Sequence, residues 1–196
     1  MKSRHTAFVV LVSILLASCA PSNAVNSTMN TMEPESTTVA SVEPIPSPAW
    51  LTVPMTDAQT GDTFTVADLK GKVVLVEGMA TWCPTCWAQA NELKLLKQKL
   101  NAGDDFVIVS LAMDLKEDAG VLKEYAATGG YDWLFVTSTM DLYRDIGTRY
   151  GATYLDPTLV PLFIVDKQGG VQNFRKGKIP SAELEDMIKP LLEAKL

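Results

Sequence analysis

Histidine is nearly absent from this sequence: the only one is His5, close to the N-terminus. Cysteine is scarce too, with three residues at positions 19, 83 and 86. We predict below that the segment containing His5 is removed, which leaves no histidine for a Cys–His or Ser–His–Asp catalytic group. A zinc site of the usual Cys and His ligands would also be short of ligands. The closely spaced pair Cys83 and Cys86 is what remains for catalysis.

Basic residues are in the minority. The 196 residues include 17 Lys and Arg against 23 Asp and Glu, and the formal net charge is −6. Nucleic-acid binding depends on clustered positive charge that faces the phosphates. We therefore expect no nucleic acid among the partners. The length and composition fit one globular domain with additional residues at the ends.

The N-terminal residues lack an apolar run long enough for a membrane span, but they have the features of a secretion signal. A cationic start precedes the apolar run 7–16, and Leu-Ala-Ser-Cys follows at 16–19. A transmembrane helix needs about 20 apolar residues, so we predict that residues 1–18 are a cleaved signal peptide. The tetrapeptide resembles the lipobox of bacterial lipoproteins. This resemblance implies a lipid on Cys19 that anchors the protein to a bacterial membrane on its extracytoplasmic side. Ordinary signal cleavage, which would leave a free thiol, is the alternative.

The residues after Cys19 lack any strand or helix periodicity. They are rich in Ser, Thr, Asn, Pro and Glu and contain few large apolar side chains. Such a composition cannot bury enough apolar surface to fold. We predict that residues 19–48 are a lipid-anchored, disordered tether and that the globular domain spans residues 49–196.

Strand and helix patterns alternate within the predicted domain. Continuous apolar runs suited to buried strands lie at 73–80 and 106–113, and apolar residues at helical spacing lie between them, at 84–100. This unit implies a parallel pair of strands joined by a right-handed crossover. Further patterns predict a short strand at 64–66, helices at 117–128 and 141–150, a strand at 134–137, a hairpin of 161–166 with 171–175, and a helix at 181–195 that Pro190 kinks or interrupts. The order predicts an α/β fold in which a central mixed β-sheet carries helices on both faces.

The candidate redox motif lies where the first core strand ends and the longest helix begins. Residues 82–86 read Trp-Cys-Pro-Thr-Cys. Unpaired backbone N–H groups and the helix dipole stabilise a thiolate at such a helix N-terminus and lower its pKa. Pro84 suits the first helical turn, where its missing N–H costs nothing. We predict Cys83, at the exposed end, as the attacking nucleophile and Cys86, one turn inward, as the resolving thiol. An inert disulfide and half of a zinc site are the structural alternatives.

Residues 75–86 resemble the active-site strand and turn of the thioredoxins. The stretch 80–86, Ala-Thr-Trp-Cys-Pro-Thr-Cys, is especially similar to the membrane-tethered thioredoxins of cytochrome c maturation, the CcmG/DsbE and ResA/TlpA types. This resemblance implies a thioredoxin-like fold and a thiol–disulfide oxidoreductase that needs no cofactor. It also implies partner proteins with disulfides or thiols, apocytochrome c among them, and a membrane thiol reductase as electron donor. Trp82, Pro84 and Thr85 would then contact the substrate.

Three further positions are carried over from the same resemblance. Glu77, six residues before Cys83, corresponds to the buried acid beneath the disulfide, which can relay a proton to and from Cys86. The alternative for Glu77 is a side chain that reaches solvent. Pro161 matches the cis-proline of the family, and the backbone of Val160 before it would pair with a substrate chain. A trans-proline at a strand start is the alternative here.

Two departures from the resemblance concern the surroundings of the motif. The loop 153–160 is longer than in the members that reduce apocytochromes, and Gly78-Met79 replaces the usual aromatic pair after the buried acid. The resemblance favours a reductant, while the partner and the direction of electron flow stay open.

Two other functions are alternatives to a thiol–disulfide oxidoreductase. A lipoprotein thiol peroxidase is suggested by Met113-Asp114 and the helix after it, although Ala80 stands where peroxidatic sites usually have Thr, three residues before the attacking Cys. A copper-delivery lipoprotein of the same fold needs three residues between its cysteines and a distant His. This chain has two intervening residues and no such His.

Overall fold

The computed structural model describes residues 47–195. The predicted signal peptide, Cys19 and the predicted tether up to residue 46 lie outside the described residues. Within residues 47–195, no helix is both long and apolar enough to cross a membrane.

A mixed sheet forms the centre of the described domain. Its five strands are β3 (Val73–Met79), β4 (Phe106–Ala112), β5 (Leu134–Thr137), β6 (Leu162–Val165) and β7 (Val171–Arg175). They lie in the order β5-β4-β3-β6-β7, with parallel pairing of β3 with β4 and of β4 with β5, and antiparallel pairing of β6 with β3 and β7. The predicted mixed sheet and the parallel pair formed by the two longest strands are therefore confirmed.

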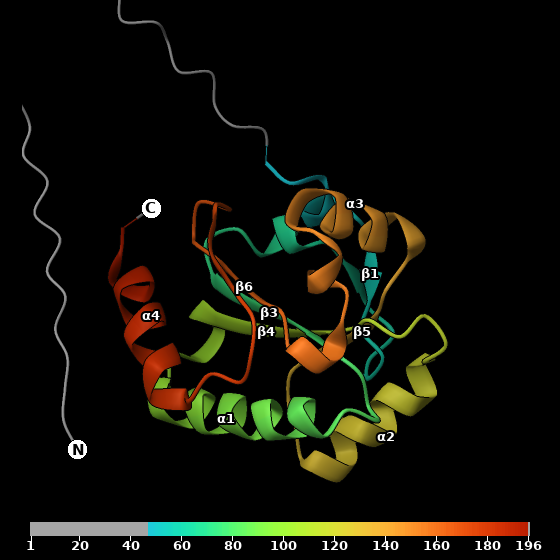
Figure 1. The fold of residues 1–196 in the computed structure, drawn as a ribbon. Helices are drawn as coiled ribbons and strands as arrows, with labels where there is room; N and C mark the ends of the chain where they lie inside the picture. Colours follow the sequence, from blue (N-terminus) through green and yellow to red (C-terminus); the bar gives the residue numbers. More distant parts are fainter. Residues whose placement is uncertain (1–46, 196) are drawn as a thin grey trace, which may run out of the picture. The chain divides into compact units, whose positions relative to one another are not determined.

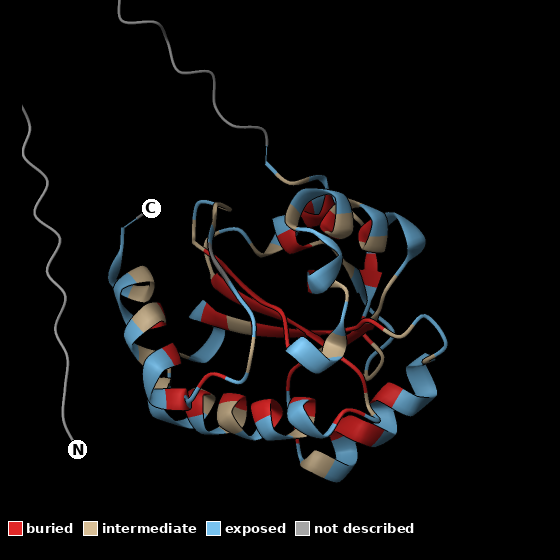
Figure 2. Ribbon diagram, in the orientation of Figure 1, coloured by how far each residue is buried: buried red, intermediate tan, exposed pale blue. Residues whose placement is uncertain are grey.

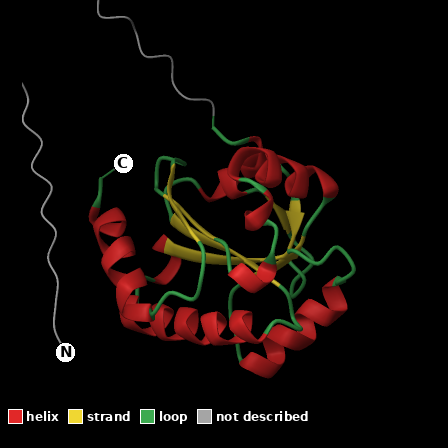
Figure 3. Cartoon of the chain, in the orientation of Figure 1, coloured by secondary structure: helices red, strands yellow, loops and turns green. Residues whose placement is uncertain are grey.

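Helices cover both faces of this sheet. One face carries α1 (Pro84–Leu100), α2 (Ala119–Gly129) and α4 (Ser181–Glu193), and the other carries α3 (Met140–Tyr150) and the 3-10 helix η1 (Ala49–Thr52). Figure 1 and Figure 3 show the strands between these two layers. β3, β4 and β6 are buried almost throughout and β5 is buried at its two central residues, whereas the outer sides of the helices are exposed (Figure 2). The predicted three-layer arrangement is confirmed.

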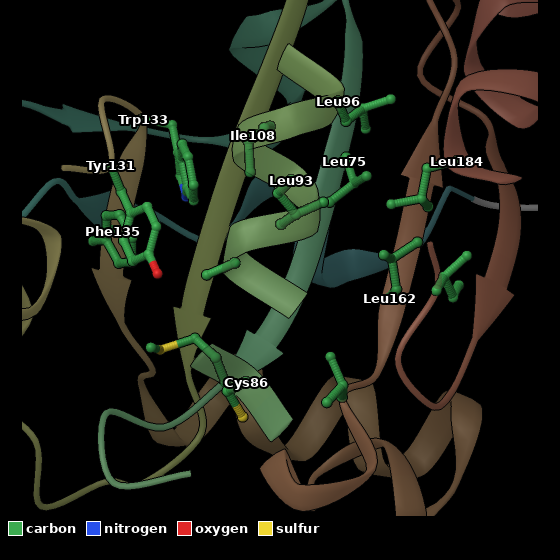
Figure 4. Close-up of a cluster of buried hydrophobic side chains, with 14 of the residues drawn as sticks. Leu75, Cys86, Leu93, Leu96, Ile108, Tyr131, Trp133, Phe135, Leu162 and Leu184 are labelled. Atoms are coloured by element: carbon green, nitrogen blue, oxygen red, sulfur yellow. The ribbon is translucent and has the colours of Figure 1, made fainter. Parts of the chain in front are cut away.

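The core beneath α1 contains the cysteines. In β3 the side chains of Val73, Leu75 and Met79 point to this face, because alternate residues of a strand face opposite sides. Figure 4 shows Leu93 and Leu96 of α1 next to Leu75 and Ile108 of the sheet, the aromatic residues Tyr131, Trp133 and Phe135 to one side, and Cys86 near the start of α1. The redox motif is thus part of the main hydrophobic core of the described domain.

A small hairpin of β1 (Met55–Thr56) and β2 (Thr63–Phe64) precedes this core, and the sequence patterns predicted only part of it. The strand predicted at 64–66 ends at Phe64, because Thr65 caps the 3-10 helix η2 (Val66–Leu69). Thr65 Oγ1 accepts from Asp68 N–H, and the Asp68 carboxylate accepts from Thr65 N–H in return. This capping box is stronger than the strand propensity of Val66.

The helix ends also differ in detail from the predictions. α1 spans the predicted residues 84–100, whereas α2 begins at Ala119 because Asp118 is its N-cap and accepts from Val121 N–H. α4 runs without interruption through Pro190 to Glu193, so of the two predicted effects of Pro190, a kink or an interruption, the interruption does not occur.

Gly78 occupies a position in β3 with no room for a side chain. A Cβ atom there would lie 2.6 Å from Cγ of Pro161 and 2.9 Å from Cε of Met113. Gly78→Ala is therefore expected to lower the free energy of unfolding by about 1–3 kcal/mol, the usual cost of overpacking a core. Urea unfolding measures this change. Gly120→Ala in α2 is the milder comparison, because its nearest neighbour would be the flexible Asp118 side chain, with Oδ1 at 3.1 Å, and alanine favours a helix, so its loss of stability is expected to be smaller. Equal stability of Gly78→Ala and the parent would contradict the prediction.

Candidate redox site

Cys83 and Cys86 form a disulfide at the N-terminus of α1, with their Cα atoms 5.2 Å apart. Cys83 is the N-cap residue of the helix, and its Sγ accepts a hydrogen bond from the backbone N–H of Cys86 at 3.2 Å. Pro84 follows in the first helical turn. The motif therefore lies between the strand and the helix that the sequence predicted for it.

The disulfide is covered, although Cys83 was predicted at an exposed end. Each cysteine is only 1% exposed. The cover is the loop after α3, which contains the 3-10 turns η4 (Ala152–Tyr154) and η5 (Pro157–Leu159), and η5 contacts α1 (Figure 1). The carbonyl oxygen of Pro157 lies 3.2 Å from Cys86 Sγ and 3.7 Å from Cys83 Sγ. Sequence spacing does not reveal this cover, because the contacts join positions 71 and 74 residues apart.

Pro161 does not adopt the predicted cis form. No cis peptide bond occurs in the part of the chain that the structure describes, so this prediction is wrong. Val160 ends η5 in the left-handed region, with φ +44°, and its N–H donates to the Pro157 carbonyl at 2.9 Å. This turn leads a trans Pro161 into β6, where its carbonyl accepts from Gly78 N–H at 2.7 Å. The N–H of Val160 is used within the loop and its side chain is fully buried, so this arrangement does not offer it to a substrate strand.

The three predicted substrate contacts Trp82, Pro84 and Thr85 lie exposed around the disulfide. Trp82 is 57% exposed, and its indole N–H donates to Asp114 Oδ2 at 2.9 Å. Hydrogen bonds from the Lys116 N–H and from the Trp82 indole lower the pKa of Asp114. The carboxylate therefore stays charged and holds the indole in one orientation.

Glu117 holds the turn before the cysteines, a role that sequence reasoning missed. Its Oε1 accepts from Thr81 N–H at 2.7 Å and from Thr81 Oγ1 at 2.5 Å. Asp114 and Glu117 follow β4 as the redox motif follows β3. Because β3 and β4 are parallel neighbours, their carboxyl ends meet at one edge of the sheet, where functional groups of α/β proteins gather. Applied to the sequence, this rule could have identified Asp114 and Glu117 as candidate site residues.

Glu77 is buried in β3, directly opposite Ser110 in the ladder with β4. Ser110 Oγ donates to Glu77 Oε1 at 2.6 Å, and Trp133 Nε1 donates to Ser110 Oγ at 2.8 Å. Burial raises the pKa of Glu77 to about 7, while the Ser110 hydrogen bond acts in the opposite direction. The alternative of a side chain that reaches solvent is excluded, because Glu77 is 1% exposed. A carboxyl with this pKa can both accept and donate a proton near neutral pH.

The sequence profile of the Redoxin family matches residues 30–188 of the chain. The chain belongs to the Redoxin family. This assignment confirms the resemblance to the thioredoxin superfamily, and the fold of solved relatives agrees with it. A structure of a thioredoxin family thiol:disulfide interchange protein from Chlorobium tepidum has a TM-score of 0.61 and 25% identity, and the match covers 76% of this chain and 99% of that one.

Two further proteins are similar to this Redoxin family chain. The thiol:disulfide interchange protein DsbE of Pseudomonas aeruginosa is 28% identical over 132 residues, which are 66% of this chain and 65% of DsbE. The match therefore spans slightly less than two thirds of that relative. A secreted disulfide oxidoreductase of Mycobacterium tuberculosis, homologous to DsbE of E. coli, has a TM-score of 0.57 and 17% identity over 72% of this chain and 97% of that one. At this identity the likeness supports the fold alone.

A cavity of about 350 Å³ lies between Trp82 of the redox motif and Pro157 of the covering loop in this Redoxin family chain. Its walls come from the redox motif, the segment after β4, α3 and the covering loop, and are formed by Trp82, Met113, Asp114, Leu115, Lys116, Tyr143, Leu155 and Pro157. Leu115 at its edge is 47% exposed. The cavity therefore offers apolar side chains next to Trp82 and to the loop that covers the disulfide.

The described residues contain no group of three or more His, Cys, Asp or Glu that could hold a metal ion. Cys83 and Cys86 are paired with each other. Reversible opening and closing of this disulfide is a reaction that the arrangement can perform, and Glu77 is a buried acid on the strand that leads to the redox motif.

Proposed function

We propose that the chain is a thiol–disulfide oxidoreductase that exchanges electrons with partner proteins through Cys83 and Cys86. The observation that carries this proposal is the disulfide at the N-cap of α1 in a chain of the Redoxin family. The similarity to the relatives from Pseudomonas aeruginosa and Chlorobium tepidum, both thiol:disulfide interchange proteins, supports it.

The proposed reaction as a reductant has two steps. The Cys83 thiolate attacks a partner disulfide, one partner sulfur leaves, and a mixed disulfide forms. The Cys86 thiol then loses its proton to the Glu77 carboxylate and attacks Cys83 Sγ. The second partner sulfur leaves, so the partner gains two electrons and the Cys83–Cys86 disulfide is restored.

The covering loop sets a condition on the first step. Cys83 Sγ must be reached by a partner sulfur, and the Pro157 carbonyl now lies against it at 3.7 Å. We propose that η5 shifts when a partner binds and that the 350 Å³ cavity beside Trp82 receives an apolar side chain next to the partner cysteine. The hydrogen bond from the Trp82 indole to Asp114 would keep one wall of this cavity in place.

The proposed location is extracytoplasmic, on a bacterial membrane. The predicted signal peptide and the predicted lipid on Cys19 support it. The motif resemblance supports apocytochrome c as one partner and a membrane thiol reductase as the source of electrons. In this proposal the tether lets the domain reach partners in the space next to the membrane.

The reduction potential of the pair tests the proposed reaction and its direction. After equilibration in dithiothreitol or glutathione buffers, thiol labelling with a mass tag counts the reduced cysteines of a chain that starts at residue 47. We expect two labels to be gained together at a potential near or below that of thioredoxin, about −270 mV. A potential near −120 mV, typical of an oxidant, would reverse the proposed direction. Absence of any reversible disulfide would contradict the activity itself.

A further inference from the structure

We infer that Ser110 is a positioning residue for Glu77. The Ser110 hydroxyl, in an orientation set by Trp133, donates to Glu77 Oε1 and leaves Glu77 Oε2 as the atom that gains and loses the proton. This inference rests on the proposed function, because Glu77 matters only if Cys86 exchanges a proton during turnover.

The three residues share one face of the sheet. Glu77 and Ser110 are directly opposite in the parallel ladder of β3 and β4. Glu77 alternates with Leu75 and Met79, which face the core beneath α1 together with both cysteines. Trp133 belongs to the same core and comes from the chain just before β5. The polar chain therefore lies in the layer that contains the disulfide.

The direction of the hydrogen bonds follows from the chemistry of the groups. An indole N–H can only donate, so the 2.8 Å contact makes Ser110 Oγ an acceptor from Trp133. The Ser110 hydroxyl hydrogen is then directed to Glu77 Oε1, 2.6 Å away, since a carboxylate oxygen accepts. A hydroxyl oriented in this way donates to the ionised acid and stabilises it.

The second carboxyl oxygen has a different environment. Glu77 Oε2 is buried and has no hydrogen-bond partner among residues 47–195. A buried carboxylate oxygen without a donor is costly to charge. Protonation at Oε2 removes this cost while Oε1 keeps its bond from Ser110. The geometry thus separates the two oxygens into a held atom and a reactive atom.

The remaining titratable groups around Glu77 do not replace Ser110. α2 contributes Tyr125 and the segment after it contributes Tyr131; burial, and then the charge of Glu77, raises the pKa of both phenols, so they stay neutral near pH 7. Glu117, on the segment after β4, acts electrostatically on Tyr125. α1 contributes the two cysteines, and β6 places Leu162 opposite Glu77. Among these groups of the described residues, the donor to Glu77 is Ser110.

An infrared titration of the oxidised protein tests the inference, because the cysteines do not titrate in the disulfide. The carboxyl C=O band of Glu77 is identified by its loss in Glu77→Gln. Ser110→Ala is expected to raise the midpoint of this band by about one pH unit or more, because a hydrogen bond to a charged group is lost. Trp133→Phe is expected to raise the midpoint less, because the Ser110 hydroxyl loses its orienting bond from the indole but can still donate to Glu77. In each variant, the pH profile of the resolving step should move to higher pH by as much as the carboxyl midpoint of that variant does, and the plateau rate should be unchanged.

The matched control is Ser138→Ala, which removes a hydroxyl that donates to the Ala112 carbonyl instead of to Glu77. Its titration midpoint is expected to equal that of the parent. The inference is overturned if Ser110→Ala leaves the midpoint unchanged, or if its resolving step is slower by the same factor at every pH, as a merely structural defect would make it. Failure of the proposed function is distinguishable, because the parent would then show no exchange while the carboxyl titration would be unaffected.

Discussion

The Cys83→Ser variant is expected to lose catalysed thiol–disulfide exchange down to the uncatalysed rate. The thiolate of Cys83 is the proposed nucleophile, and a serine hydroxyl remains protonated at neutral pH and does not attack a disulfide. The fold should tolerate the change. Serine is a preferred N-cap residue, and its oxygen can accept from Cys86 N–H in place of Sγ. Reduction of a disulfide-containing protein by the variant, followed with a thiol reagent, measures the loss.

Cys86→Ser is the informative partner experiment. With Cys83 intact and the resolving thiol absent, the first step proceeds and the second does not. We expect a mixed disulfide with partner proteins that is stable on a non-reducing gel and released by dithiothreitol. The assignment of roles would be reversed if Cys83→Ser accumulated the mixed disulfide and Cys86→Ser did not.

The Glu77→Gln variant is expected to be less active and, above neutral pH, more stable than the parent. The pKa of Glu77 rises from 4.5 to about 7 in the folded protein. An acid with a raised pKa contributes stability that is fully present below about pH 4.5 and is lost as the pH rises through 7. The shift corresponds to about 3 kcal/mol. Glutamine cannot ionise, so Glu77→Gln avoids this loss and should exceed the parent at pH 8 by up to that amount.

The two effects of Glu77→Gln have separate measurements. Urea unfolding of the oxidised protein at pH 5 and pH 8 should show a fall in stability for the parent and a smaller one for the variant. The rate of the resolving step at pH 7 should fall by about 10²-fold or more, as on removal of a general base. Glu124→Gln, on the exposed side of α2, is the matched control and should change neither quantity. Equal pH dependence of stability in Glu77→Gln and the parent would show that folding does not raise the pKa of Glu77.

Local patterns in the sequence were sufficient for the main elements. Apolar periodicity located α1 at residues 84–100 and β5 at residues 134–137 with the bounds that the structure has. The position of the Cys-Pro-Thr-Cys motif at a helix N-terminus followed from the same periodicity. These features depend on neighbouring residues along the chain, so a single sequence contains their signal.

Capping and turn geometry limited the predictions at the ends of elements. Asp118 delays the start of α2, and the box of Thr65 with Asp68 ends β2 early. The left-handed Val160 brings Pro161 into β6 as a trans residue, although the resemblance implied a cis bond. Each of these outcomes depends on hydrogen bonds of single backbone groups, which hydrophobic patterns do not report.

The sequence by itself determined the fold class, the redox pair and the candidate buried acid. Only the tertiary structure decided which groups surround them. Ser110 lies 33 residues from Glu77, Glu117 lies 36 from Thr81, and Pro157 lies 71 from Cys86. These contacts form because parallel strands bring their carboxyl ends together and because the loop after α3 folds back over α1. Neither event leaves a local pattern, since the free energy that selects them comes from packing between distant segments.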